Sequence, residues 1–489
     1  MNQGDSSCEV LILGTGFAGL GMAIKLRQAG IGEVLLLERA AELGGTWRDN
    51  TYPGCACDIP SHLYSFSFEP YAGWSRMFPS QPEIQDYLLR VAEKHRLRPL
   101  IRFNAEAIEA RFDEAAGRWR VRTRDGRRFD ARFLVSATGG LSQPAYPDIA
   151  GLGQFAGPVF HSAQWRHDVD LAGKRVAVIG TGASAIQFVP QIAPQVAQLD
   201  LYQRTPPWVI AKPDHPIAGL RRWLIGHLPF YRRFLRLLLY LQYESRALGF
   251  VAAPRLMKLM EKFGRTHLKR QVPDEKLRAR LTPDYTLGCK RVLIANDYYP
   301  ALSRPNVAVI GEGIASVTPG GIRTSDGAEH PADVVILATG FRATDPLSPM
   351  KFYGAGGIEL HDAWRDGAEA YYGMTVAGFP NLFLMVGPNT GLGHNSIVFM
   401  IEAQIRYIVQ CIRCTRAKGA RTIALRPEVQ RRFNANLQRR IAHTVWATGC
   451  KSWYMDRHGK NVTLWPGFTV EYWWRTRRAR AQDYIFADA

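Results

Sequence analysis

Short apolar runs that alternate with glycine turns dominate the first part of the chain. Val10–Leu13 is wholly apolar, as expected of a buried parallel strand, and it leads through a glycine turn into a helical pattern that extends to about Ala29. The second predicted strand is Val34–Glu38, four apolar residues followed by a glutamate. The order strand, glycine turn, helix, strand predicts a βαβ unit at the start of the chain.

The same pattern occurs again after residue 170. The strand-like run Lys174–Ile179 precedes the turn GTGASA (Gly180–Ala185), and Gln198–Thr205 has the pattern of a following strand. Two further buried runs, Asp130–Gly140 and Ala332–Phe341, both contain Ala-Thr-Gly at or near their ends. Because both motifs are duplicated, the sequence predicts an α/β protein with two Rossmann-like dinucleotide-binding domains.

A segment of different composition lies between the two halves of the second predicted domain. Residues 214–282 are rich in Leu, Arg and aromatic residues and lack strand alternation, which predicts a helical insertion. We interpret the Leu and aromatic face of this insertion mainly as core.

The glycines of the first turn have separate predicted tasks. Gly14 allows a tight turn, Gly16 lets the backbone approach a pyrophosphate, and Gly19 lets the helix pack on the strand. The free N–H groups at the start of the helix then bind phosphate. Glu38, at the end of the second strand, is placed to hold ribose hydroxyls.

The second turn predicts a phosphorylated nicotinamide cofactor. Its glycine positions are Gly180, Gly182 and Ala185, and the strand that follows ends in Gln203-Arg204-Thr205 with no acid at the ribose position. Arg204 can pair with a 2′-phosphate, so we predict NADPH rather than NADH. The residues of this half that we expect to contact the cofactor are Gly180, Thr181, Gly182, Ala183, Ser184, Ala185, Gln187, Arg204 and Thr205.

Three further segments carry unusual residues at fixed spacings. Phe155–Trp165 has the spacing F-x-G-x-x-x-H-x-x-x-W, with Phe155, Gly157, His161 and Trp165 as its anchors. Gly44–Tyr64 contains Gly-Gly-Thr-Trp and Tyr-Pro-Gly, and Gly288–Leu302 begins Gly-Cys-Lys-Arg. With these segments the chain resembles type I Baeyer–Villiger monooxygenases, which are class B flavoprotein monooxygenases. The family's linker motif normally has Pro or Asp after the Trp, where this chain has Arg166.

The resemblance covers nearly the whole chain and implies a domain plan. Residues 1–144 and 346–489 would form a discontinuous FAD-binding domain, and residues 145–345 the NADPH-binding domain. Asp58 would lie at the junction of flavin and nicotinamide, Lys290 near the NADP phosphate, and Arg291 in the active site. The remaining residues that we expect to contact a cofactor are Thr46, Trp47, Arg48, Asp49, Tyr64, Ala107 and Trp453.

The implied reaction is the conversion of a ketone to an ester or lactone with dioxygen, NADPH and FAD, through a flavin peroxide. A fixed guanidinium, assigned to Arg291, would stabilise the developing negative charge, and Asp58 would pair with it. His161 and Trp165 either couple rotation of the NADPH domain to catalysis or simply pack the hinge. The sequence leaves the ketone and the oligomeric state open.

Two other functions fit part of the pattern. A flavin-dependent N- or S-hydroxylating monooxygenase has a similar linker, but Trp165 and the Lys290-Arg291 pair favour the Baeyer–Villiger reaction. A non-catalytic flavin- and nucleotide-binding regulator would not need both Asp58 and Arg291.

The chain is basic, with 62 Lys and Arg against 43 Asp and Glu. Residues 204–280 contain 17 Lys and Arg residues and 5 Asp and Glu residues. No nucleic-acid module is present, so we interpret this as a solvated basic face that also attracts a phosphate-rich cofactor. Membrane contact is not expected; at most it would be peripheral, through Leu220–Phe250.

Cysteine usage and the N-terminal residues favour a cytoplasmic enzyme. The first residues are polar, and no signal peptide is predicted from them. The seven cysteines, an odd number, indicate no disulfide framework. Cys411 and Cys414 form a CxxC without a second ligand pair nearby, so no metal site is predicted.

Overall fold

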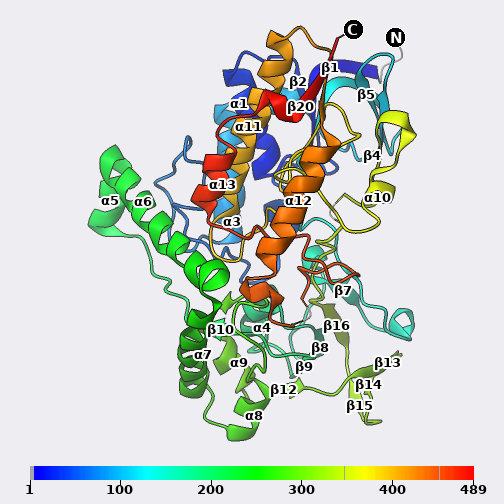
Figure 1. Cartoon of the computed structure of the whole chain (residues 1–489). Coiled ribbons are helices and arrows are strands. Elements are labelled where there is room, and N and C mark those ends of the chain that lie inside the picture. The colour runs from blue at the N-terminus through cyan, green and yellow to red at the C-terminus, as the bar shows by residue number, and fades with distance from the viewer. Residues whose placement is uncertain (1–4, 346, 451, 489) are drawn as a thin grey trace.

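A mainly parallel sheet forms the first lobe of the protein, near both chain ends (Figure 1). The computed structural model describes residues 5–345, 347–450 and 452–488. The strand order is β17-β4-β5-β6-β1-β2-β3, and β18 also pairs with β6. These strands are β1 (Asp5–Leu13), β2 (Val34–Leu37), β3 (Ile101–Arg102), β4 (Ala107–Asp113), β5 (Arg118–Thr123), β6 (Arg128–Ser136), β17 (Lys351–Tyr353) and β18 (Leu382–Leu384).

A five-stranded parallel sheet forms the second lobe, at the opposite end of the molecule (Figure 1). Its order is β12-β9-β8-β16-β7, and a separate antiparallel sheet, β13-β14-β15, lies beyond it. The strands are β7 (Val159–His161), β8 (Arg175–Ile179), β9 (Gln198–Tyr202), β12 (Val307–Ile310), β13 (Ile314–Thr318), β14 (Gly321–Thr324), β15 (Glu329–Pro331) and β16 (Val334–Leu337).

The two sheets repeat one arrangement around their central strands. β1 lies between β2 and β6, β8 lies between β9 and β16, and all four pairings are parallel. One face of β16 packs in the same core as α4 (Ala185–Ile192) and the other in the same core as β13 and β14, so β16 is buried at every position. Most of α1 (Phe17–Gln28) is likewise buried, packed against α11 (Ile397–Ala417). The duplicated motifs of the sequence thus correspond to two similar parallel sheets.

The chain returns to the first sheet after the second lobe, because β17 pairs with β4 and β18 with β6. The boundaries at residues 144 and 346 stay a prediction. The helices outside the insertion are α2 (Thr46–Asp49), α3 (Gln81–Lys94), α4 (Ala185–Ile192), α9 (Tyr298–Leu302), α10 (Leu360–Ala363), α12 (Pro427–Ile441) and α13 (Thr469–Arg475). A last pair of strands, β19 (Thr422–Leu425) and β20 (Tyr484–Ala487), is antiparallel.

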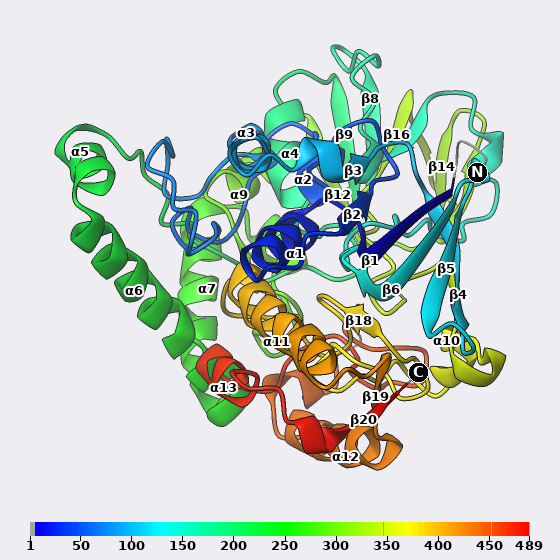
Figure 2. The same cartoon turned by 90° about the horizontal axis from the view of Figure 1, so that it is seen from above.

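Four α-helices separate β10 (Val209–Ile210) from β11 (Leu293–Ile294), and the first of them, with the start of the second, projects from the body of the molecule (Figure 2). They are α5 (Gly219–His227), α6 (Pro229–Ser245), α7 (Met257–Gln271) and α8 (Glu275–Arg280). One face of α6 is buried, but the opposite face, also apolar, is exposed. The interpretation of the insertion's apolar residues as core therefore holds for only part of them, because α6 contacts the body along one side.

A disulfide between Cys289 and Cys450 corrects the expectation of no disulfide. The two Cα atoms are 6.2 Å apart, although 161 positions separate the residues in sequence. Cysteine spacing gives no sign of this pair, because only the fold brings the two segments together. None of the described helices is long and apolar enough to cross a membrane. The cytoplasmic localisation stays a prediction.

Breaking this disulfide is expected to loosen the C-terminal segment. Cys450→Ser should lower the thermal unfolding midpoint by about 2–4 °C, because the unfolded chain regains the freedom of a long loop. Peptide mapping without reductant should recover the Cys289 and Cys450 peptides as one linked species. Cys414→Ser, at a half-buried free cysteine, is the matched control and should leave the midpoint unchanged. An unlinked pair of peptides would contradict the assignment.

Candidate active site between the two lobes

In the first glycine turn, Gly14 and Gly19 pack tightly against backbone, whereas Gly16 has free space beside it. Gly14 has a φ of +100°, and a Cβ there would lie 2.7 Å from the carbonyl oxygen of Ala137. A Cβ on Gly19 would lie 1.9 Å from the carbonyl oxygen of Gly14. Around Gly16 the nearest atoms to a Cβ, on Gly44 and Gly45, are 3.9 Å away. The turn therefore holds β1 and α1 in close contact and leaves the backbone of Gly16 accessible.

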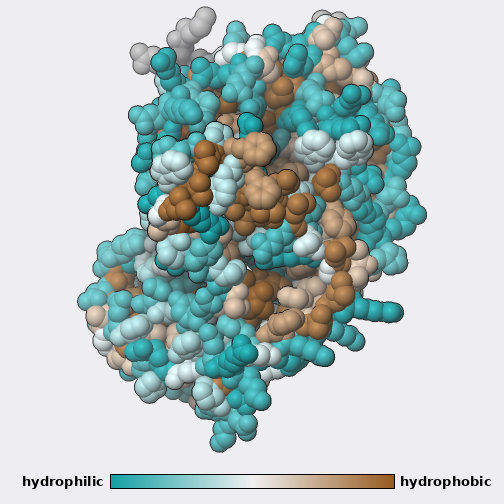
Figure 3. All heavy atoms as spheres, turned by 90° about the vertical axis from the view of Figure 1, so that its left-hand side faces the viewer, coloured by the Kyte–Doolittle hydropathy of each residue, from teal (hydrophilic) through white to brown (hydrophobic). Residues whose placement is uncertain are grey.

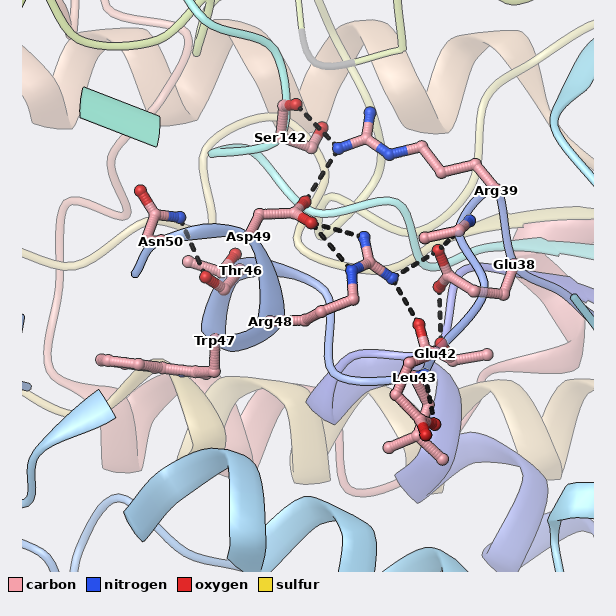
Figure 4. Close-up of polar contacts among 12 residues, drawn as sticks. Glu38, Arg39, Glu42, Leu43, Thr46, Trp47, Arg48, Asp49, Asn50 and Ser142 are labelled. Carbon is pink, nitrogen blue, oxygen red and sulfur yellow. Dashed lines mark hydrogen bonds and ion pairs between the residues drawn. The ribbon is translucent and has the colours of Figure 1, made fainter. Parts of the chain in front are cut away.

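A buried carboxylate, Glu38, closes the carboxyl end of β2 (Figure 4). Its Oε1 accepts a hydrogen bond from Nη1 of Arg48 at 2.6 Å, and its Oε2 accepts one from the Thr15 hydroxyl at 2.5 Å. Arg48 also pairs with Asp49 through its Nη2, at 2.7 Å. Burial alone would lower the pKa of Arg48, but Glu38 and Asp49 outweigh it and raise this pKa. The predicted residues Glu38, Arg48 and Asp49 thus form one network. Thr15 also belongs to this network, although it was not predicted from the sequence.

A second missed residue, Arg39, extends this network. Its Nη2 lies 2.9 Å from an oxygen of Asp49 and donates to the Ser142 carbonyl at 3.3 Å (Figure 4). Ala107 opens β4 two residues after Ala105, whose N–H donates to the Glu38 carbonyl at 2.8 Å. The network therefore connects the loop after β2 with the segment that enters β4.

Two aromatic residues of the predicted flavin loop contact each other. Trp47, on α2, donates its ring N–H to the Tyr64 hydroxyl at 3.2 Å, and the two rings meet edge to face at 5.6 Å. Phe17, at the start of α1, meets Tyr64 at 5.2 Å. Burial raises the pKa of Tyr64, so its hydroxyl remains protonated. Thr46, which begins α2, accepts a hydrogen bond from Asn50 through its carbonyl (Figure 4).

The first glycine of the second turn also packs tightly against backbone. Gly180 has a φ of +110°, and a Cβ there would lie 2.4 Å from the carbonyl oxygen of Ala338. No atom lies within 4 Å of a Cβ on Gly182. Thr181 donates its hydroxyl hydrogen to the Thr205 carbonyl at 3.3 Å, which connects the turn to the end of β9. The turn residues Thr181, Gly182, Ala183 and Ser184 are half-buried or exposed, and Ala185 is buried at the start of α4.

Two cations gather beside this turn. Arg204 is exposed just after β9. Burial lowers the pKa of Lys290, and the nearby charge of Arg204 lowers it further. The Nζ atom of Lys290 lies 4.7 Å from the centre of the Tyr285 ring. The structure thus brings together two cations that are far apart in sequence.

Gln187, on α4, connects the second lobe to the flavin loop. Its Oε1 accepts a hydrogen bond from the Tyr52 hydroxyl at 3.0 Å, and its Nε2 donates to the Ala56 carbonyl at 2.9 Å. These contacts fix α4 against the first lobe, a position that the sequence pattern did not indicate.

An ion pair between the lobes lies at the centre of the predicted site. Asp58 comes from the loop that precedes Tyr64, and Arg291 lies just before β11. Nε of Arg291 is 3.0 Å from Oδ2 of Asp58, and Nη2 of Arg291 contacts the same oxygen. The side chains are 31% and 28% exposed for Arg291 and Asp58, respectively. The Asp58 carboxylate raises the pKa of Arg291, which therefore carries a permanent charge.

The C-terminal segment lies close to this ion pair. The ring of Trp453 is 4.4 Å from that of Tyr454, and Trp453 is partly exposed. Tyr454 is buried near Arg291, and its burial raises the pKa of its hydroxyl. Within the described parts of the chain, this hydroxyl has no hydrogen-bond partner. Sequence reasoning named Trp453 and missed Tyr454, whose only signal was its place beside that Trp.

The linker anchors are mainly packing residues. A Cβ on Gly157 would lie 2.3 Å from the carbonyl oxygen of Asp333, and Phe155 is buried in the core of the second lobe. His161 is fully buried, its Nδ1 accepts a hydrogen bond from the Ala163 N–H at 3.1 Å, and burial lowers its pKa. The ring of Trp165 lies 5.2 Å from that of Phe188 on α4.

An exposed ion pair and a bridge between the lobes follow the linker. Arg166, in the position where the family has Pro or Asp, pairs with Asp168. The Thr51 hydroxyl lies 2.9 Å from Nε2 of His167. Among the residues that the structure describes, no group of three or more His, Cys, Asp or Glu side chains could hold a metal ion.

Two dinucleotide turns on two lobes, with a charged pair between them, define the class of two-lobe flavin- and nicotinamide-dependent oxidoreductases. In agreement, residues 11–228 match the family model described as pyridine nucleotide-disulphide oxidoreductase. The chain is 50% identical over 479 residues to a Baeyer-Villiger monooxygenase of Pseudomonas aeruginosa, covering 98% of this chain and 91% of that one. A Baeyer-Villiger monooxygenase of Streptomyces coelicolor is 46% identical, with 97% and 92% covered.

Solved structures agree with the sequence relatives. An oxidised steroid monooxygenase bound to NADP superposes with a TM-score of 0.89 at 31% identity, over 99% of this chain and 100% of that one. A closed cyclohexanone monooxygenase gives 0.89 at 26% identity over the same shares. The chain belongs to the Baeyer–Villiger monooxygenase family. The resemblance stated from the sequence and the predicted fold class are both confirmed.

Proposed function

We propose that the protein is an NADPH- and FAD-dependent Baeyer–Villiger monooxygenase that converts ketones to esters or lactones with dioxygen. The observation that carries this proposal is the Arg291–Asp58 pair, which joins the two lobes where flavin and nicotinamide would meet. The identity to named relatives supports it. The names of the matched steroid and cyclohexanone monooxygenases support a small ketone as the substrate.

The first lobe fits FAD. Gly16 has open space beside it, and the N–H groups at the start of α1 are available to a pyrophosphate. Glu38, buried at the end of β2, suits ribose hydroxyls, although Arg48 and Thr15 share its oxygens. The other residues that we propose for this site are Gly14, Gly19, Thr46, Trp47, Asp49, Tyr64 and Ala107. When bound, FAD supplies electron transfer from NADPH and activation of dioxygen.

The second lobe fits NADPH. The open side of Gly182 accepts the pyrophosphate, and Arg204 with Lys290 provides two positive charges for a 2′-phosphate. Trp453, on the C-terminal segment, would approach the nicotinamide side of the site. The packing of His161 and Trp165 supports a hinge that holds the lobes in register, without a proton-transfer role.

Replacement of Arg204 is expected to reduce the preference for NADPH over NADH. Arg204→Ala should raise KM for NADPH by about ten- to a hundredfold, because a charge-assisted contact to the 2′-phosphate is lost. KM for NADH should change little. Steady-state rates with both cofactors measure this. Arg304→Ala, at an exposed arginine of the same lobe, is the matched control. An unchanged preference in the Arg204 variant would show that the phosphate binds elsewhere.

Arg291 is positioned to act on the ketone. Its guanidinium can donate hydrogen bonds to the carbonyl oxygen, on which negative charge develops as oxygen adds to the carbon. Asp58 holds the guanidinium in one orientation. Overall, ketone, O2, NADPH and a proton give ester, water and NADP+. One carbon–carbon bond breaks, and two carbon–oxygen bonds replace it around the inserted oxygen atom.

Product analysis tests the assignment. The yellow enzyme is mixed with NADPH, air and a panel of ketones, and products are read by gas chromatography and mass spectrometry. Esters or lactones, heavier than the ketone by one oxygen atom, are expected. Oxygenated amines or sulfides without ester would move the protein to the hydroxylating family. Hydrogen peroxide alone would make it an NADPH oxidase, and bound flavin without NADPH oxidation would favour a regulator.

A further inference from the structure

The outer face of the helical insertion is apolar and exposed. Along one side of α6 the large apolar residues face solvent, and Phe230 is 84% exposed. The spacing of i, i+4, i+7, i+8 and i+11 places this stripe on one side of the helix. We call it the outer face of the α5–α6 hairpin; its apolar residues are Leu220, Trp223, Leu228, Phe230, Phe234, Leu237, Leu238 and Leu241. Figure 3, which looks at this side of the molecule, shows apolar residues gathered across its middle.

The charges around this face are almost all positive. The segment 217–271 contains twelve Lys and Arg residues and only two acids, Glu244 and Glu261. Neither acid is exposed: Glu244 is buried, and Glu261 is half-buried and accepts a hydrogen bond from the Leu287 N–H. Arg222, Arg233 and most of the other cations are exposed. The face therefore combines apolar side chains with an uncompensated positive charge.

The hairpin is fixed to the body by the inner side of α6 and by the C-terminal end of that helix. Nη1 of Arg236 donates to the carbonyls of His62 at 2.5 Å and Ser65 at 3.0 Å. At the other end of α6, Glu244 accepts hydrogen bonds from the Asn395 side chain and the Thr469 hydroxyl, both at 2.7 Å. Leu235, Leu239 and Tyr243 on the inner side of α6 are buried, and Glu244 is buried at its C-terminal end. The outer face, from Phe230 to Leu241, is therefore held outward in a defined orientation.

Neighbouring elements add the same kind of residue. On α7 and the turn before it, exposed apolar side chains follow the spacing i, i+3, i+4 and i+7 between lysines and arginines; they are Leu256, Leu259, Met260 and Phe263. α13 begins beside α6, since the Thr469 and Tyr240 hydroxyls are 3.0 Å apart. It exposes Trp473 and Trp474. Such mixtures of Trp, Phe, Leu and Arg are typical of protein surfaces that lie at a lipid headgroup boundary.

We infer that the outer face of the α5–α6 hairpin docks on the surface of an anionic lipid bilayer. Phe230, Phe234 and the leucines enter the headgroup boundary, and the surrounding cations meet acidic lipids. A second copy of this chain is a poorer occupant, because a symmetric interface would place this positive face against itself. The attachment is to one leaflet, in keeping with the absence of a membrane-spanning helix among the described residues.

Vesicle co-sedimentation of the holoenzyme tests this inference. Vesicles of phosphatidylcholine with about 30% phosphatidylglycerol are compared with pure phosphatidylcholine. Binding to the anionic vesicles should be at least about tenfold stronger and should weaken as salt is added. Phe230→Glu/Phe234→Glu should weaken it by about tenfold or more, because two large apolar groups are lost from the lipid contact.

The matched control places the same charges on other exposed apolar positions. Ile358 and Ile485 lie outside the hairpin, so Ile358→Glu/Ile485→Glu should bind vesicles as the unaltered protein does. Both double variants should keep their FAD and their turnover of a water-soluble ketone, because none of the four residues is in the proposed site. Vesicle binding therefore tests the inference even if the proposed reaction is wrong.

Three results would overturn the inference. The first is no binding to the anionic vesicles, and the second is equal binding by the Phe230→Glu/Phe234→Glu variant and the unaltered protein. In the third, light scattering finds a dimer that this variant dissociates, while vesicles bind neither form. The face would then be an interface between two copies of the chain.

Discussion

Arg291→Ala is expected to lower ester formation by about 10²–10³-fold, while NADPH still reduces the flavin. The reason is that Arg291 would stabilise charge on the ketone oxygen, a step that follows reduction. Asp58 holds the guanidinium, with Nε of Arg291 3.0 Å from Oδ2 of Asp58, and alanine removes this oriented charge. Anaerobic stopped-flow measurement of flavin reduction, beside product analysis in air, separates the two steps. Hydrogen peroxide should rise as ester falls.

Two companion variants sharpen this test. Arg291→Lys keeps a charge but loses the planar donors, so it should recover little ester formation. Asp58→Ala should lower ester formation less than Arg291→Ala, since the charge stays but its orientation is lost. Arg304→Ala is the control for removal of an arginine from the same lobe. Ester formation at the unaltered rate in the Arg291→Ala variant would remove this residue from the mechanism.

Gly19→Ala is expected to give a protein without bound flavin. The added Cβ would lie 1.9 Å from the carbonyl oxygen of Gly14, so α1 must move away from β1 and carry with it the N–H groups that we propose for phosphate binding. We expect a loss of about 3 kcal/mol or more in the free energy of unfolding, since backbone rather than a flexible side chain must shift. Visible absorbance of the purified protein and its melting temperature measure both effects.

The control for this substitution lies in the same βαβ unit. Gly32 precedes β2, and a Cβ there would have no atom within 4 Å. Gly32→Ala should therefore bind FAD and melt as the unaltered protein does. If Gly19→Ala also retains its flavin, close packing between β1 and α1 is not a condition for cofactor binding.

The duplicated fold could be predicted because its signals are local. A glycine turn after an apolar run specifies both a backbone conformation and a buried strand, and the structure has those strands within a few residues of the expected places. β1 begins earlier than Val10, at Asp5, because its first residues pair with β6. Pairing with a distant strand leaves no mark in the local pattern.

The site was predictable mainly where a resemblance supplied it. Asp58 and Arg291 are 233 positions apart, and no local pattern predicts that they meet. Thr15 and Arg39 were missed because a threonine in a turn and an arginine after a strand are common, and only their contacts with Glu38 and Asp49 distinguish them. The Cys289–Cys450 disulfide was missed because no local pattern shows that two cysteines 161 positions apart meet in the fold.

The exposed stripe on α6 shows a different limit. Apolar periodicity tells which residues share a helix face, but it does not tell whether that face meets protein, lipid or solvent. α6 has apolar residues on two sides, and the pattern treats both alike. Only the positions of its neighbours separate the inner side from the outer face.

The ion pair between the lobes also constrains how this enzyme can be recombined with its relatives. Arg291 comes from the second lobe, and the carboxylate that orients it comes from the first. A chimera that imports residues 145–345 from a homologue would inherit the arginine without its own Asp58 loop. Gln187 faces the same loop through Tyr52 and Ala56. We therefore expect cofactor preference and catalysis to be exchanged together only if residues 52–58 are transferred along with the second lobe.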